Sequence, residues 1–210
     1  MKRSHLRAAA VPAVTAAVLV LSPASVARAA DYTSNEHAPW TTTTTPWVRH
    51  TPSVTIGAFR DRVGNGFGPW KGVGTRFQPA AAADIADFTP SASACANNTI
   101  TTHRRSIVKI AQTWSCETNG VKWGASIEFN SGVNWYTGTG TPTSTQKDLA
   151  AISTHEVGHS AGLGHIINEA SYCTWMASGR ATMCAEIGNG SIIERTLTGM
   201  DIESLQYDYP

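Results

Sequence analysis

Apolar and polar residues alternate in several short runs along the first two thirds of the chain. Because the side chains of a β-strand point alternately to its two faces, this pattern predicts half-buried strands. The predicted strands are residues 53–59, 106–114 and 124–129. The dipeptide Asn119-Gly120 is typical of a tight turn and predicts that the last two strands form a hairpin. Regions rich in glycine and proline predict loops at 64–74 and 132–142.

A helical spacing of apolar residues replaces this alternation over residues 145–161. The apolar positions are Leu149, Ile152 and Val157. Gly162 predicts the end of the helix, because glycine readily adopts the left-handed conformation that terminates helices. A hydroxyl side chain among residues 143–145 is expected to cap the first turn.

Two further helices are predicted. A short one over residues 80–88 follows Pro79. The sequence Thr198-Gly199-Met200-Asp201 resembles a capping box and predicts a C-terminal helix. The apolar face of that helix would carry Ile202, Leu205 and Tyr209. Because the strands come first and the helices last, the fold class is α+β.

Composition and charge exclude several classes of protein. The chain has 210 residues, 41% of them hydrophobic and 15% charged, with a formal net charge of +1. This length and hydrophobic share are those of one folded domain rather than of a disordered chain. A net charge close to zero argues against a nucleic-acid partner, since such proteins neutralise phosphates with Lys and Arg.

Residues 1–29 have the features of a secretory signal peptide. Basic residues precede an uncharged, alanine-rich run at 8–27, which favours a bacterial origin, and cleavage is expected after Ala29. An uncleaved membrane anchor is the alternative, which two prolines disfavour. Since no later segment is apolar enough to span a bilayer, we expect a secreted, extracellular protein without a membrane partner. It would comprise a polar, threonine-rich segment at 30–52 and one folded domain at 53–210.

The expected export of the protein indicates what its four cysteines do. In an oxidising compartment an even number of cysteines predicts disulfides. We favour Cys95–Cys116 and Cys173–Cys184 among the three possible pairings, because each closes a short loop. A zinc site made of four cysteines is the alternative, but the chain has no C-x-x-C spacing.

The strongest chemical signal is the sequence H-E-V-G-H-S-A-G-L-G-H at residues 155–165. Positions four apart on a helix share one face, so His155 and His159 can bind the same metal ion. A turn at Gly162 would bring His165 to that ion as the third ligand. Three protein ligands leave a fourth position for water, as in catalytic rather than structural zinc sites. Glu156 is then placed to take a proton from that water.

This motif resembles the extended zinc motif of the metzincin metalloproteases, H-E-x-x-H-x-x-G-x-x-H. The flanking residues Asp148-Leu149 and the stretch from Arg195 to Tyr207 are most similar to the matrixin branch. The resemblance covers about residues 145–210. It implies a zincin catalytic domain with a twisted, mostly parallel sheet, an active-site helix and a C-terminal helix.

The resemblance also implies a methionine in a turn beneath the metal. Met176 and Met183 are both candidates, and the distance of Met183 from the C-terminal helix favours it. Residues 30–52 contain no cysteine, so the thiol that keeps many matrixins latent is missing, and whether this segment is a propeptide stays open. Acidic residues are sparse between Asp87 and Asp148, so calcium sites are uncertain.

The sequence therefore predicts a secreted, monomeric zinc endopeptidase that uses one zinc ion, a zinc-bound water and Glu156 as general base. Its partner would be a protein or peptide, held along an edge strand near residues 124–130. Two alternatives stay open. One is a zinc-dependent hydrolase of a non-peptide amide, and the other is a non-catalytic zinc-binding module of the cell envelope.

Overall fold

The structure is a computed structural model of the 210-residue chain. It describes residues 33–210 except 36–37, 41–45, 55–56, 72, 74, 81–82, 85–94, 96 and 175–178. The predicted signal peptide at 1–29 and the methionine candidate Met176 lie outside the described residues. In the part of the chain that is described, no helix is long and apolar enough to cross a membrane.

A five-stranded sheet forms one layer of the fold, in the order β3-β2-β4-β6-β5. Three of its four strand pairings are parallel, and only β5 runs antiparallel to its neighbour β6. The strands are β2 (Trp47–His50), β3 (Ala83–Asp84), β4 (Thr99–Arg105), β5 (Ala111–Thr118) and β6 (Val121–Asn130). This mixed architecture, with a mostly parallel sheet and several helices, confirms the α+β class.

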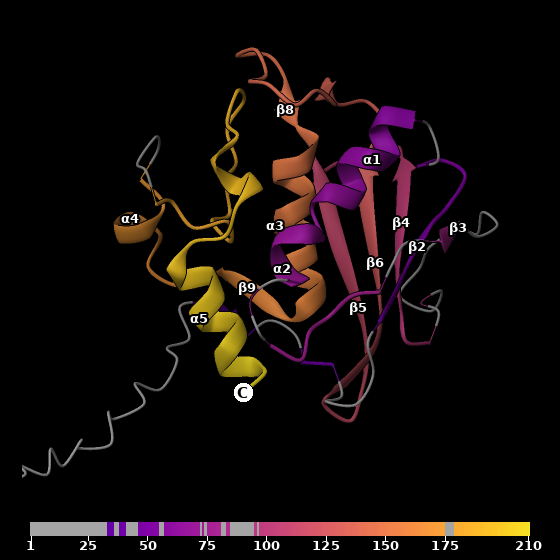
Figure 1. The fold of residues 1–210 in the computed structure, drawn as a ribbon, viewed down its shortest axis with the longest axis vertical. Helices are drawn as coiled ribbons and strands as arrows, with labels where there is room; N and C mark the ends of the chain where they lie inside the picture. The colour runs from indigo at the N-terminus through magenta and orange to yellow at the C-terminus, as the bar shows by residue number, and fades with distance from the viewer. Residues whose placement is uncertain are drawn as a thin grey trace, which may run out of the picture.

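Helices cover the sheet in a second layer (Figure 1). The central helix α3 (Leu149–Ala161) contacts β5, β6 and α1 (Gly57–Asn65). On β6 the side chains of Ile127 and Phe129 are fully buried, and the Phe129 ring packs edge-on against Phe59 of α1. The apolar alternation along β6 therefore provides the sheet side of the core.

The remaining elements lie mainly beyond α3 or at the top of the molecule (Figure 1). The C-terminal helix α5 (Gly199–Asp208) is on the side of α3 away from the sheet, as are β9 and α4. Thr198 and Asp201 form the capping box expected at the start of α5. The short elements are α2 (Gly68–Lys71), β7 (Trp135–Tyr136), β8 (Lys147–Asp148), β9 (Leu163–Ile166), α4 (Glu169–Tyr172) and the 3-10 helix η1 (Ile193–Arg195).

Several local predictions need correction. Residues 57–59 begin α1 rather than a strand, because Phe59 and Val63, four residues apart, share its buried face. Within the predicted loop 64–74, the segment 68–71 forms α2 around the fully buried Trp70. In the predicted helix 80–88, Ala83–Asp84 forms β3 instead, because it pairs with β2.

The predicted hairpin is present, but its first strand is displaced along the sequence. Asn119 and Gly120 both have positive φ in the turn, as a tight hairpin turn requires. The first strand of the hairpin begins at Ala111 rather than at residue 106, and it continues to Thr118. The second strand, β6, is not the edge strand that was expected near residues 124–130. It lies between β4 and β5, and β5 is the edge.

The polar N-terminal segment contributes to the same fold, so the domain starts before residue 53. Strand β2 pairs with both β3 and β4 inside the sheet. Strand β1 (Thr33–Asn35) pairs antiparallel with β9. Trp40 is buried, and its indole N–H donates to the Ser160 carbonyl at 2.7 Å. The polar composition of the segment gave no sign of this role, because its partners lie more than thirty positions away along the chain, and more than a hundred for Thr33 and Trp40.

Two disulfides are present, with the pairing that was expected. Cys95–Cys116 ties β5 to the segment before β4, and Cys173–Cys184 ties the end of α4 to the segment after Met183. Disulfides of this kind are typical of exported proteins, with which the structure is compatible.

Candidate metal centre

Helix α3 carries the first part of the centre, and its two ends are fixed by local chemistry. Asp148 caps the N-terminus, where its Oδ1 accepts a hydrogen bond from the Ala151 N–H at 2.8 Å. The cap is therefore this carboxylate and not one of the hydroxyls at 143–145. Gly162 ends the helix with φ 120°, a conformation that side chains rarely adopt. The chain then reverses into β9, which carries His165.

Three histidines converge at this reversal. The Nε2 atom of His159 lies 3.0 Å from Nε2 of His155 and 3.2 Å from Nε2 of His165. Two nitrogen ligands of one tetrahedral zinc ion lie about 3.3 Å apart, if each is about 2.0–2.1 Å from the metal. His155, His159 and His165 are therefore arranged so that they could hold a metal ion.

The hydrogen bonds of the Nδ1 atoms determine whether the Nε2 atoms of His155 and His159 can bind a metal ion. Nδ1 of His155 lies 2.7 Å from the Thr182 carbonyl oxygen, and Nδ1 of His159 lies 2.8 Å from that of Leu163. Since a carbonyl oxygen only accepts, each Nδ1 carries a proton, and the Nε2 atom of the neutral ring presents a lone pair. Two lone pairs at 3.0 Å repel each other unless a cation lies between them.

Burial keeps the first histidine in this neutral form. Burial lowers the pKa of His155 to about 4, against the opposing effect of its hydrogen bond to Thr182. The charges of His165 and Arg180 lower this pKa further. His155 is therefore unprotonated at neutral pH, which is the form that binds metals.

Glu156 lies beside the histidines and is also buried. The hydroxyl of Thr113 on β5 lies 2.6 Å from Oε2 of Glu156 and donates to it. Burial raises the pKa of Glu156 to about 7, whereas the Thr113 hydrogen bond and the charge of Lys109 lower it. A carboxyl group with a pKa near neutrality is suited to exchanging protons with a reacting molecule.

A cavity of about 640 Å³ opens in front of these groups. Helix α3 contributes Ile152, His155, Glu156 and His159, and β9 contributes His165. The loop before β5 together with β5 itself forms one side. Ala185 and Ile187 form another. The predicted site residues His155, His159, His165 and Glu156 thus meet in one cavity.

The C-terminal end of α3 is capped by side chains from three distant segments. The Lys122 amine donates to the carbonyls of His159 and Ser160 at 3.2 and 3.1 Å. The Tyr209 hydroxyl donates to the Ala161 carbonyl, and Trp40 donates to that of Ser160. Helix carbonyls at this end have no partner within the helix, so these donors fix the turn before His165.

Replacing Lys122 with methionine is expected to change the pH dependence of stability. Burial lowers the pKa of Lys122 to about 7, despite the charges of Glu117 and Asp208. Between pH 7 and pH 10 the unfolded chain binds a proton there that the folded chain does not, so stability rises with pH. The rise from this residue is up to about 4 kcal/mol. Urea unfolding from pH 7 to pH 10 should show a flatter profile for Lys122→Met than for wild type.

Above pH 10 the comparison would be confounded by Tyr209, whose pKa burial raises, so that its stabilising effect is lost as the pH rises. The Lys122→Met measurement is therefore confined to lower pH. Equal slopes for the two proteins would show that Lys122 is charged in the folded state.

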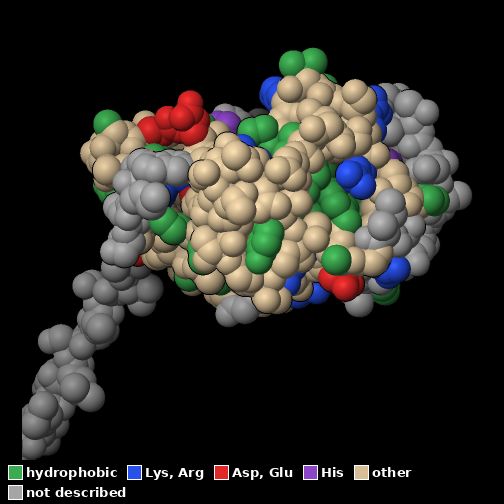
Figure 2. All heavy atoms as spheres, turned by 90° about the horizontal axis from the view of Figure 1, so that it is seen from above, with side chains coloured by type: hydrophobic (Ala, Val, Ile, Leu, Met, Phe, Trp, Pro, Cys, Tyr) green, Lys and Arg blue, Asp and Glu red, His purple; other side chains and the backbone are tan. Residues whose placement is uncertain are grey.

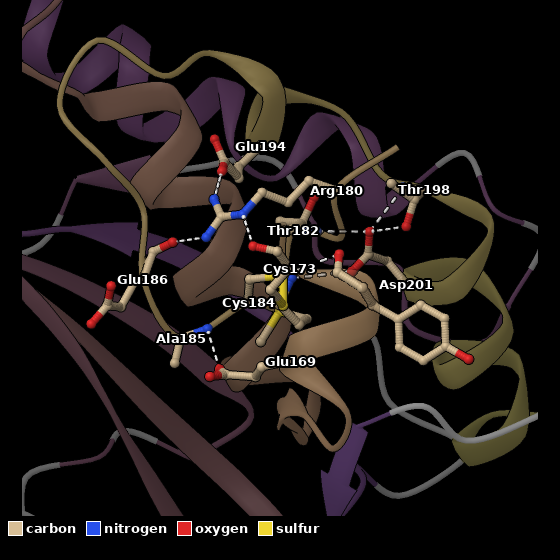
Figure 3. Close-up of a disulfide and its surroundings, with 12 residues drawn as sticks. Glu169, Cys173, Arg180, Thr182, Cys184, Ala185, Glu186, Glu194, Thr198 and Asp201 are labelled. Atoms are coloured by element: carbon tan, nitrogen blue, oxygen red, sulfur yellow. Dashed lines mark hydrogen bonds and ion pairs between the residues drawn. A yellow bond between two sulfur atoms is a disulfide. The ribbon is translucent and has the colours of Figure 1, made fainter. Parts of the chain in front are cut away.

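Met183 packs against α3 at Gly158, which lies between His155 and His159 in sequence. Asp201 accepts a hydrogen bond from the backbone of Met183. A Cβ atom on Gly158 would lie 2.2 Å from Met183 Sδ, so only glycine allows this approach. The carboxylate of Asp201 accepts from the N–H groups of Thr182 and Met183 at 3.0 and 3.1 Å (Figure 3). The Thr182 carbonyl is in turn the partner of His155. Asp201 of α5 thus holds the turn at Thr182, and the carbonyl of Thr182 orients the ring of His155.

Gly158→Ala is expected to destabilise the metal-free protein by about 1–3 kcal/mol, because the new methyl group meets Met183 and Trp70. The Trp70 ring cannot move aside easily, since its indole donates to the Thr154 carbonyl, and the Met183 thioether would have to shift as well. This clash outweighs the gain of up to about 1 kcal/mol in helix propensity.

Gly64→Ala is the matched control, because Gly64 also lies in a helix but a Cβ there meets nothing within 4 Å. It should be neutral or stabilising in the same urea titration. A Gly158→Ala protein as stable as the Gly64→Ala protein would contradict the tight contact.

The disulfide Cys173–Cys184 and the ion pair of Arg180 with Glu194 lie close together in the segment that ends in η1 (Figure 3), and a second ion pair joins η1 to the start of α3. The buried Arg180 guanidinium contacts the Glu194 carboxylate and donates to the carbonyls of Glu186 and Cys173. In the second ion pair, Arg195 binds Asp148, with Nε 3.0 Å from Oδ1, and donates to the carbonyls of Thr139 and Gly140 at 2.7 and 2.8 Å. These guanidinium groups connect η1 and the cap of α3 to the loop before η1 and to the loop before β8.

The residues that sequence reasoning missed act through long-range contacts. Thr113, Lys122, Asp148 and Asp201 all touch the ligand helix, Glu156 or the turn behind His155. Asp148 had a sequence signal as an N-cap residue directly before the apolar helix, and Asp201 had one only as part of the capping box of α5. Comparisons of the sequence with protein-family models and with curated proteins gave no match.

Proposed function

We propose that the protein is a secreted zinc-dependent endopeptidase of the metzincin type, similar to matrixins. The observation that carries the proposal is the convergence of three imidazoles and one buried carboxyl group in one cavity. Imidazole ligands are typical of zinc, and three of them leave room for a reacting molecule.

The chain fits one zinc ion at this place. The donor set would be His155, His159 and His165, with the carbonyls of Thr182 and Leu163 fixing two of the rings. When bound, zinc supplies a Lewis acid that polarises a carbonyl group and lowers the pKa of a water molecule.

Glu156 would act as general base and then as general acid. Its carboxylate would take a proton from the attacking water and deliver it to the leaving amine. Thr113 holds this carboxylate with a hydrogen bond of 2.6 Å, and Glu156 is buried. The positive charge of a bound metal would favour the ionised form of Glu156 that the first step needs.

The edge strand β5 would hold the peptide substrate. Residues 111–113 of β5 line the cavity, and β5 has a neighbour on one side only. An extended peptide can add to such an edge through main-chain hydrogen bonds, which places a peptide bond next to Glu156. This role belongs to β5 and not to residues 124–130 in β6.

The proposal includes export after removal of residues 1–29, and a protein or peptide as the partner. The mature chain would carry the N-terminal strand β1, which pairs with the strand of His165. Because this pairing is part of the fold, trimming into residues 33–40 is expected to weaken the centre rather than to activate it.

The decisive experiment uses the mature protein, loaded with one equivalent of zinc, and a diverse peptide library. Cleavage that stops when a zinc chelator is added supports the proposal. Cleavage that a chelator does not affect, or no cleavage of any peptide, contradicts it. An amide-hydrolase assay on non-peptide substrates then separates the remaining alternatives, because a non-catalytic zinc module would hydrolyse neither class.

A further inference from the structure

The loop between β4 and β5, residues 106–110, forms an exposed rim of the cavity. Val108 and Ile110 line the cavity, although their side chains are 103% and 39% exposed. Exposed apolar side chains next to a reactive centre are typical of a surface that binds another molecule. Lys109 lies between them and also lines the cavity.

This rim has a fixed backbone. The Asn130 side chain donates to the carbonyls of Ile107 and Lys109 at 2.7 and 2.9 Å. The backbone N–H of Asn130 donates to the Ile110 carbonyl at 3.0 Å, and Ser131 N–H donates to that of Arg105 at 2.8 Å. The backbone position of Lys109 is therefore set before a ligand arrives, so only its side chain has to be ordered on binding.

Lys109 is the one Lys or Arg among the described residues that line the cavity. Within the described part of the chain it makes no ion pair. Its charge reaches Glu156, whose pKa it lowers. Lys109 thus places a positive charge at the mouth of the site without a partner from the described residues.

Two exposed carboxylates lie near the wall formed by Ala185 and Ile187, but outside the cavity. Glu186 lies between these two residues in sequence, and Glu169 accepts a hydrogen bond from the Ala185 N–H at 3.0 Å. Both carboxylates line a separate pocket. Figure 2 shows acidic side chains gathered on one face of the molecule. The positive charge of Lys109 therefore lies at the cavity itself, whereas these negative charges lie beyond its lining.

We propose that Lys109 selects peptides with an Asp or Glu side chain at one position near the scissile bond, with apolar neighbours resting on Val108 and Ile110. This inference rests on the proposed peptidase function and names a substrate class for it. The carboxylate of the peptide would pair with the Lys109 ammonium, while Glu156 stays available for proton transfer.

Peptide binding tests this inference separately from catalysis. Short peptides with blocked ends would carry Glu, Gln or Lys at each position in turn, and their binding to zinc-loaded Glu156→Gln protein would be measured by fluorescence anisotropy. Blocked ends ensure that the carboxylate comes from a side chain. At one position, Glu should bind about three- to tenfold more tightly than Gln, and the preference should shrink as salt is added.

The further substitution Lys109→Gln should abolish this preference, and Lys109→Glu should turn it into a preference for Lys. Lys71→Gln is the matched control, because Lys71 is exposed at the end of α2 and does not line the cavity. No preference for Glu, or a preference that persists in Lys109→Gln, would overturn the inference. Parallel cleavage assays of wild-type protein report on the peptidase function alone, so the two failures are distinguishable.

Discussion

Replacing Glu156 with glutamine should lower kcat/KM for peptide cleavage by about a hundredfold to ten-thousandfold, the usual contribution of a general base. Glutamine has nearly the same size as glutamate, and its side-chain oxygen can still accept the Thr113 hydroxyl, now 2.6 Å from Oε2. The fold and the histidines should therefore be unchanged. The measurement is steady-state cleavage of a peptide identified from the library, together with the zinc content of the variant.

Glu203→Gln is the control for this change, because Glu203 is an exposed carboxylate on α5 outside the cavity. It should retain wild-type activity. A Glu156→Gln protein that binds one zinc ion and cleaves at the wild-type rate would rule out Glu156 as the base. Loss of zinc together with loss of activity would instead show that Glu156 shapes the metal centre.

Removal of one ligand should abolish the stabilisation that zinc provides. A metal present at a thousand times its dissociation constant stabilises the folded state by about 4 kcal/mol. His165 is the ligand of choice for this test, since it is only partly buried and its truncation leaves little empty space in the core. Thermal unfolding of His165→Ala should show the same midpoint with zinc and with a chelator, whereas the wild-type midpoint should rise with zinc.

The metal-free proteins provide the internal control. Without metal, His165→Ala should be about as stable as wild type, because His165 is only partly buried and its truncation leaves little empty space in the core. If zinc raised the midpoint of the variant as much as that of wild type, the metal would be bound elsewhere.

The sequence was sufficient to predict the centre because its main parts are local. His155, Glu156 and His159 lie within two turns of one helix, and Gly162 sets the reversal that brings in His165. Helical periodicity and the conformational freedom of glycine govern both features, and neither depends on the rest of the fold.

The parts that could not be predicted depend on pairings between distant segments. The position of β5 at the edge follows from the parallel pairing of β6 with β4, for which the β5–β6 hairpin gives no signal. The same holds for the contact of Thr113 with Glu156, 43 residues away, and for the pairing of β1 with β9. A polar segment such as residues 33–40 has no apolar periodicity, so only its partners show that it is folded.

The arginine contacts around α3 bear on how chelation experiments are interpreted. The guanidinium groups of Arg180 and Arg195 bind carboxylates and several loop carbonyl oxygens at once, which are the ligand types that a hard divalent cation prefers. These positive charges are covalently part of the chain and cannot dissociate when a chelator lowers the concentration of free ions. A chelator should therefore leave these two sets of contacts in place. A loss of activity on chelation would then not arise from the loss of the arginine contacts that hold the loops around α3.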